Sequence, residues 1–112
     1  MLPRRFAVLY AIAAAGTAHA DVPPKPPCAD CVLELPKPAA ELDAAKPLPL
    51  LVLLHGDGER ATYVASKWRA AARERGWILF APQCPTAEGC GTSWWKWDGD
   101  PAWLEGQVGK LR

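Results

Sequence analysis

His55-Gly56-Asp57-Gly58 is the stretch of this sequence whose residue types are best suited to chemistry. It lies between an unbroken apolar run and an amphipathic segment. Its two glycines allow a sharp turn and a close approach of the backbone to a ligand. Backbone N–H groups in such a turn can stabilise the negative oxygen of a tetrahedral acyl intermediate, at about 3–4 kcal/mol per donor. The stretch therefore suits an oxyanion-binding loop, although the bare H-G-x-G pattern also suits an ordinary tight turn.

Histidine is also a common general base and metal ligand, so His55 has alternative roles. Asp57 is two residues away in a tight turn, and side chains placed in this way rarely converge on one metal ion. His19 lies in a segment that we expect to be removed, which leaves His55 as the only histidine of the mature chain. We predict a structural His55, no metal site and no cofactor, with the Asp57 side chain shaping the turn and the helix start.

A group of four tryptophans is the second candidate for a binding site; its members are Trp94, Trp95, Trp97 and Trp103. Aromatic rings in a loop can bind sugar rings or aromatic acyl groups, which would make Trp94 and Trp95 substrate-binding residues. They can equally close the edge of a hydrophobic core or mark a partner surface. Because Trp95 and Trp97 alternate along the chain and can face inward together, packing at the edge of the core is the favoured interpretation.

The chain has four cysteines, Cys28, Cys31, Cys84 and Cys90. An even number of cysteines in an exported chain predicts disulfides, and three pairings are possible. We favour Cys28 with Cys31 and Cys84 with Cys90, because each pair is close in sequence. The spacing Cys28-x-x-Cys31 also matches a thiol redox motif or half of a zinc site. A redox motif belongs at a strand-to-helix junction, however, and zinc would need two further ligands, so structural disulfides are favoured.

Two short strands and a helix are predicted to position the glycine-rich turn. The run Leu50–Leu54 has no polar alternation, which indicates a strand buried on both faces of a parallel sheet. A helix follows from about Thr62 to Arg75, with Gly76 suited to its C-terminal cap. Its predicted apolar stripe comprises Val64, Trp68, Ala71 and Ala72. A second buried strand spans Trp77–Ala81, so the fold class is α/β with a parallel β-α-β unit and a right-handed crossover.

The N-terminal part of the chain has a different character. Residues 1–20 carry Arg4 and Arg5 before an apolar stretch and end in Ala-His-Ala, the pattern of a cleaved signal peptide. Residues 21–47 are rich in proline, which predicts an extended arm with one short strand within Cys31–Leu35. This pattern predicts a secreted or periplasmic protein with no membrane span, because the apolar stretch is shorter than the roughly 20 residues that a spanning helix needs.

The predicted domain covers residues 48–112. A long loop at 82–100 separates the second strand from a further helix, for which Pro101 suits the first turn. The apolar residues of that helix are Leu104, Val108 and Leu111. The chain stops inside the helix without a cap or a following strand, so we interpret it as the truncated front part of a larger domain.

Residues 48–112 resemble the early part of an α/β-hydrolase, most closely that of secreted bacterial esterases related to polyhydroxyalkanoate depolymerases and feruloyl esterases. The resemblance rests on the strand leading into His55-Gly56-Asp57-Gly58, the helix through Trp68, the Ala81-Pro82 ending of the next strand and the Trp-rich loop. It implies that the Asp57 N–H is an oxyanion donor, that Gly58 shapes the loop, and that His55 braces it by hydrogen bonds. The implied substrate is a small or polymeric ester.

The catalytic triad of that family is missing from this chain. Its nucleophile lies in G-x-S-x-G and is followed by an acid and then a histidine. Neither Ser66 nor Ser93 has that context, and His55 precedes any nucleophile. The sequence therefore predicts part of an acyl-serine ester hydrolase that is inactive alone.

Charge and composition exclude some functions and leave two rival hypotheses. Of 13 Lys+Arg, two lie in residues 1–20, so the mature chain has 11 against 12 Asp+Glu. No basic stripe suggests nucleic-acid binding. The first rival is a small disulfide-stapled binding module that uses its Trp-rich loop, and the second is a thiol oxidoreductase that uses Cys28 and Cys31. The sequence predicts neither the oligomeric state nor the identity of the ester.

Overall fold

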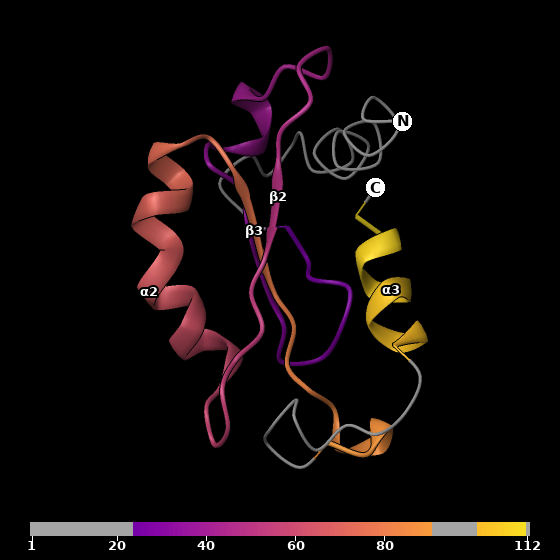
Figure 1. Cartoon of the computed structure of the whole chain (residues 1–112). Coiled ribbons are helices and arrows are strands. Elements are labelled where there is room, and N and C mark those ends of the chain that lie inside the picture. The colour runs from indigo at the N-terminus through magenta and orange to yellow at the C-terminus, as the bar shows by residue number, and fades with distance from the viewer. Residues whose placement is uncertain (1–23, 91–100, 112) are drawn as a thin grey trace.

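The structure is a computed structural model, and it describes residues 24–90 and 101–111. These residues form a small mixed α/β fold in which a three-stranded sheet lies between two helices (Figure 1). The strands are β1 (Val32–Glu34), β2 (Leu50–Val52) and β3 (Ile78–Ala81), and the helices are α2 (Ala61–Glu74) and α3 (Ala102–Gly109). Two 3₁₀ turns, η2 (Ala39–Glu41) and η3 (Thr86–Glu88), lie in the connections. The predicted α/β class is confirmed.

The predicted parallel β-α-β unit is present as β2, α2 and β3. β2 pairs with β3 in parallel, with Leu51 beside Leu79 in the register. All four residues of β3 are buried, because this strand is central in the order β1-β3-β2 and is covered on both faces. Both strands are shorter than predicted. The N–H of Leu53 still donates to Phe80 O at 2.9 Å, but Leu54 is half exposed as the chain leaves the sheet.

The proline-rich arm adds the third strand. β1 lies within the predicted run Cys31–Leu35 and pairs with β3 antiparallel, so the sheet is mixed. Leu33 of β1 is buried in the core. Glu34, the last residue of β1, forms an ion pair with Arg69 of α2, with 2.6 Å between Arg69 Nη2 and Glu34 Oε2. This hydrogen-bonded pairing raises the pKa of Arg69 above its ordinary value.

The sheet has a hydrophobic core on each face because the side chains of β3 alternate. Leu79 and Ala81 face α2, where they pack with Leu53 and the alanines of the helix. Ile78 and Phe80 belong to the other core, against which α3 packs Trp103, Val108 and the following Leu111; that core also contains Cys31 and Leu33. α3 follows Pro101 as predicted. Its buried set differs from prediction, because Gln107 is buried and Leu104 is only half-buried.

The buried face of α2 corrects the predicted apolar stripe. The helix buries Ala61, Ala65 and Ala72, whereas Trp68 is 48% exposed. Alanines face the sheet because their small side chains allow the helix to approach it closely. Consecutive residues of a helix are about 100° apart around its axis. Arg69 lies on the β1 side of the alanine face, where it pairs with Glu34, so Trp68 lies on the other side of that face, toward β2. β2 is an edge strand in the described sheet, which leaves Trp68 without a strand beneath it.

The C-terminal end of α2 has the predicted glycine cap. Gly76 has φ of +71°, and its N–H donates to Arg73 O at 3.1 Å. The N–H of Trp77 donates to Ala72 O at 2.8 Å, which completes a Schellman motif. Trp77 therefore belongs to the cap and lies outside β3, contrary to the predicted strand boundary.

Candidate functional site

The predicted oxyanion loop connects the C-terminal end of β2 to the N-terminus of α2. The C-terminal end of β3 lies beside it and continues into Gln83 and Cys84. Open α/β sheets hold their ligands at this edge, outside the carboxyl ends of parallel strands. The structure thus places His55, Asp57 and Gly58 between β2 and α2, in the turn that the sequence predicts between this strand and this helix.

His55 is the buried anchor of the loop, with only 3% of its surface exposed. The N–H of Cys84 donates to its Nε2 at 3.0 Å, so Nε2 carries no proton in this arrangement. Nδ1 then carries the proton and donates to Gly56 O at 3.0 Å. This neutral imidazole ties the loop after β2 to the segment after β3. The hydrogen bonds fit the bracing role that the resemblance implies for His55.

Gln83 extends this network to the start of α2. Its Oε1 accepts from the N–H of Ala61 at 2.8 Å, and its Nε2 lies 3.2 Å from His55 Nε2, to which it donates. Arg60 stands at the N-cap position and makes no side-chain cap hydrogen bond. Gln83 therefore supplies a capping interaction that most helices obtain from the N-cap residue itself.

The sequence reasoning did not identify Gln83. A usable signal exists, because Gln83 is the first polar residue after the buried strand β3 and comes directly after Pro82. His55 occupies a similar place after β2, three residues beyond the strand. Since the carboxyl ends of adjacent parallel strands meet at one edge, polar residues after two such strands are candidates for contact.

The other parts of the loop are open to solvent. Asp57 and Gly58 form an exposed turn, and Gly58 has φ of +73°. A Cβ at Gly58 would meet no atom within 4 Å, so glycine is favoured there by backbone conformation and not by lack of space. Within the described residues, the N–H groups of Asp57 and Gly58 have no acceptor.

Two disulfides confirm the predicted cysteine pairing. Cys28–Cys31 and Cys84–Cys90 have Cα–Cα distances of 5.5 and 6.0 Å. The first closes a turn that leads into β1, so it does not stand at the start of a helix as a redox motif would. The second includes Cys84, whose backbone N–H donates to His55, and it thus lies in the segment that contacts the loop of residues 55–58.

The other candidate residues fall partly outside the part of the chain that the structure describes. Trp94, Trp95 and Trp97 lie outside the described residues, as does Ser93. Trp103 lies on α3 and packs against the core. Ser66 lies on the exposed side of α2, where its Oγ donates to Tyr63 O at 2.6 Å. In the described part of the chain, no three His, Cys, Asp or Glu residues are grouped so as to hold a metal ion.

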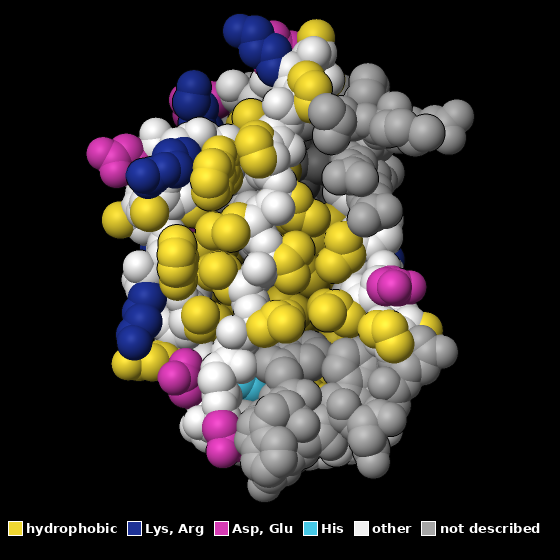
Figure 2. Space-filling model, in the orientation of Figure 1, with side chains coloured by type: hydrophobic (Ala, Val, Ile, Leu, Met, Phe, Trp, Pro, Cys, Tyr) yellow, Lys and Arg dark blue, Asp and Glu magenta, His cyan; other side chains and the backbone are white. Residues whose placement is uncertain are grey.

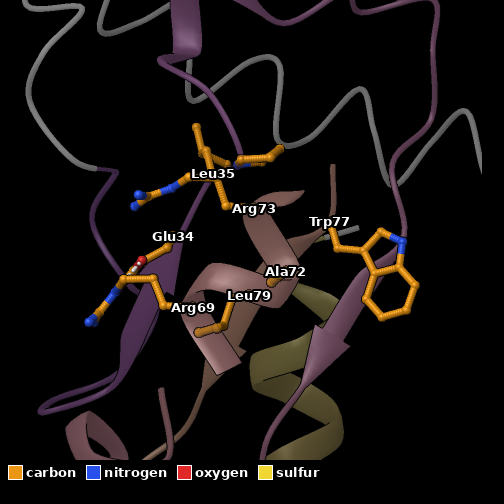
Figure 3. Close-up of a pocket in the computed structure, with 8 residues that line it drawn as sticks. Glu34, Leu35, Arg69, Ala72, Arg73, Trp77 and Leu79 are labelled. Atoms are coloured by element: carbon orange, nitrogen blue, oxygen red, sulfur yellow. Dashed lines mark hydrogen bonds and ion pairs between the residues drawn. The ribbon is translucent and has the colours of Figure 1, made fainter. Parts of the chain in front are cut away.

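Two hollows lined by described residues lie away from the predicted oxyanion loop. The one shown in Figure 3 has a volume of about 10 Å³, room for a single water, between the Glu34–Arg69 pair and Trp77. The other is a groove of about 260 Å³ lined by residues of the proline-rich arm together with Leu48 and Gly76. Leu48 and Gly76 precede β2 and β3, so this groove is at the opposite end of the parallel strands from His55.

A scan against protein-family models and searches of curated proteins and of solved structures found no match to this chain. Among residues 24–90 and 101–111, no helix is long and apolar enough to cross a membrane. The observations that bear on function are therefore those of the sequence and of the loop itself.

Proposed function

We propose that this chain is part of a secreted or periplasmic serine hydrolase that cleaves carboxylic esters, and that residues 55–58 are its oxyanion loop. The observation that supports this most directly is the contrast within the loop. His55 is buried, accepts a hydrogen bond from Cys84 N–H and donates one to Gly56 O, while Asp57 and Gly58 are exposed and their N–H groups have no acceptor in the described structure. A rigid anchor beside free donors is what preorganised electrostatic stabilisation requires.

In the proposed reaction, a serine hydroxyl attacks the ester carbonyl carbon and the carbonyl oxygen becomes negative. The Asp57 N–H donates a hydrogen bond to that oxygen and lowers the energy of the tetrahedral intermediate. The carbonyl re-forms, the alcohol leaves, and water releases the acyl group from serine. The proposed reaction requires a serine, an acid and a base in addition to the residues of this chain, which contains no G-x-S-x-G. The chain alone is inactive in this proposal.

The first test is to sequence the encoding DNA past the codon for Arg112 in all three frames. A G-x-S-x-G followed by an aspartate and a histidine is the expected result. A stop codon followed by unrelated sequence would contradict the proposal and favour a small binding protein.

The second test uses the longer protein and two substitutions at one position. Asp57→Pro removes the donor N–H and is expected to lower kcat by about 10²–10³-fold, the effect of losing one oxyanion donor. Asp57→Ala keeps the N–H and is expected to keep most of the activity, because the Asp57 side chain is exposed. Equal losses in both variants would assign the effect to the side chain and contradict a backbone donor.

A disulfide-stapled binding module is the second candidate function. It is favoured by the two disulfides and by a core on each face of the sheet, which are the features that let a small domain fold alone. It predicts saturable binding of a polymer or protein that falls when Trp94 and Trp95 are both replaced by alanine. Unchanged binding in that variant would exclude the Trp-rich loop as the binding surface.

A further inference from the structure

Gln83 contacts both ends of the loop that carries the proposed oxyanion donors. His55 begins this loop, and Ala61, the first residue of α2, follows it. The side chain of Gln83 lies 3.2 Å from His55 Nε2 through its Nε2 and 2.8 Å from Ala61 N through its Oε1. Only a small part of the His55 side chain, the cyan atoms, reaches the surface in Figure 2. One amide group therefore bridges the start and the end of the loop.

The polarity of this bridge is fixed by backbone groups. Ala61 N–H can only donate, so it faces Gln83 Oε1, and the amide nitrogen of Gln83 then faces His55. Cys84 N–H can also only donate, and it donates to the same His55 Nε2. The proton on His55 Nδ1 faces Gly56 O. The hydrogen bonds thus run in one direction, from the start of α2 through two side chains to a backbone carbonyl.

The bridge requires a side chain of a particular chemistry at position 83. It needs an acceptor for the Ala61 N–H and a donor for His55 Nε2 at the same time. Among side chains of similar length, Lys and Arg carry only donors, ionised Glu carries only acceptors, and Met has no donor. Glutamine supplies both groups on one planar amide.

The bridge ends on the peptide group that carries the proposed donor. Gly56 C=O and Asp57 N–H belong to one peptide plane, and in a trans peptide they point in opposite directions. No cis peptide bond occurs among the described residues. Gly56 O accepts from His55 Nδ1 at 3.0 Å and from Glu59 N–H at 3.1 Å. Because these contacts hold the carbonyl oxygen, the Asp57 N–H is directed away from the buried His55 ring.

We propose that Gln83 is a positioning residue for the oxyanion loop. It fixes the His55 ring relative to the start of α2, and the ring in turn holds the Gly56 carbonyl. The Asp57 N–H takes its direction from that carbonyl. This role rests on the proposed function, in which the Asp57 N–H stabilises the negative oxygen. Gln83 itself touches no reacting atom.

Two substitutions separate this role from the capping of α2. Gln83→Met keeps the length of the side chain and removes both hydrogen bonds. Adding Arg60→Ser places a hydroxyl at the N-cap position, where serine is among the preferred residues. Hydrogen exchange of the Glu59 amide, measured by NMR on the disulfide-bonded chain, reports on the turn at Gly56. We expect this amide to exchange about tenfold faster in both variants, while Arg60→Ser restores the lowered melting temperature.

Gln107→Met is the matched control, because it makes the same change on α3, across the sheet from α2. It is expected to leave the exchange of Glu59 within about twofold of the unsubstituted rate. Exchange of Glu59 that returns to that rate when Arg60→Ser is added would show that Gln83 only caps α2, and would overturn the proposal. Equal acceleration by Gln107→Met would overturn it as well, because the effect would then be general destabilisation.

The unsubstituted protein gives a readout that does not depend on any variant folding. The ¹⁵N chemical shifts of the His55 ring are expected to show a proton on Nδ1 and none on Nε2. A proton on Nε2 would overturn the proposal, because that atom could not then accept from Gln83.

Activity of the longer protein distinguishes this role from the proposed function. The variant with both Gln83→Met and Arg60→Ser is expected to lower kcat about tenfold and to leave KM within about twofold, because the oxyanion contact is made only in the transition state. Asp57→Pro is the reference. Unchanged kcat in Asp57→Pro would overturn the proposed function, and the exchange of Glu59 would still decide whether Gln83 holds the loop. A large loss in Asp57→Pro with no loss in the double variant would overturn the positioning role alone.

Discussion

At the residue scale, the properties of the site depend on one buried imidazole. His55 accepts a hydrogen bond from Cys84 N–H and donates one to Gly56 O, so it joins two loops that are far apart in sequence. Gln83 donates to His55 through Nε2, and its Oε1 accepts from Ala61 N–H and so caps α2. The turn that carries the proposed oxyanion donors is closed by the Glu59 N–H, which donates to Gly56 O at 3.1 Å, and His55 Nδ1 binds the same carbonyl oxygen.

Replacement of His55 by alanine is expected to lower the free energy of unfolding by about 2–4 kcal/mol. The substitution leaves a cavity and removes the acceptor of the buried Cys84 N–H. Urea denaturation with the disulfides intact measures the change, and Asp57→Ala is the control, expected to stay within about 0.5 kcal/mol because its side chain is exposed. Similar losses in both variants would argue against His55 as the anchor of the loop.

At the element scale, α2 is held by its two ends and by one ion pair. Gln83 caps its first turn, Gly76 ends it, and Arg69 joins it to β1. The helix packs on the sheet through alanines, whose small side chains allow a close approach to β3.

Gly76→Ala and Gly106→Ala are expected to change stability in opposite directions. Gly76 has positive φ, so alanine there is strained and should cost about 1–2 kcal/mol. Gly106 lies within α3 with open space around it, so alanine should stabilise by about 0.5–1 kcal/mol. Thermal denaturation distinguishes the two. Stabilisation by both substitutions would show that the left-handed cap is not formed.

The Glu34–Arg69 pair is expected to contribute only modestly to stability. Both side chains are partly exposed, so a double-mutant cycle with Glu34→Gln and Arg69→Met should give a coupling of about 0.5–1 kcal/mol. The coupling should decrease in 1 M salt, because the Debye length at that ionic strength is only about 3 Å. A coupling that is unaffected by salt would contradict a solvent-accessible ion pair.

At the scale of the whole molecule, two cores and two disulfides stabilise a sheet with only three described strands. Each disulfide closes a short loop, so each is expected to contribute about 2 kcal/mol through the chain entropy of the unfolded state. The test compares Cys28→Ala/Cys31→Ala with Cys84→Ala/Cys90→Ala by urea denaturation. Only the second pair is expected to increase hydrogen exchange at the oxyanion loop, because Cys84 binds His55. Equal effects on the loop would show that the disulfide does not position it.

The sequence by itself determined the β-α-β unit and the glycine cap of α2, and it favoured the observed disulfide pairing among three possible ones. These depend on local signals, namely apolar runs, the 3.6-residue period, a glycine at a helix end and cysteines close in sequence. The structure also puts the H-G-x-G turn between β2 and α2, as predicted. Its catalytic role, the signal peptide and the Trp-rich loop stay predictions.

Only the tertiary structure decided which side chains are buried and which groups meet across the site. Trp68 was predicted to be in the core and is half exposed, because burial on the flank of a helix depends on whether a strand lies beneath it. His55 contacts Gln83 and Cys84, which lie 28 and 29 positions further along the chain. No local pattern encodes such a contact; it arises because parallel pairing of β2 and β3 brings their carboxyl ends to one edge of the sheet.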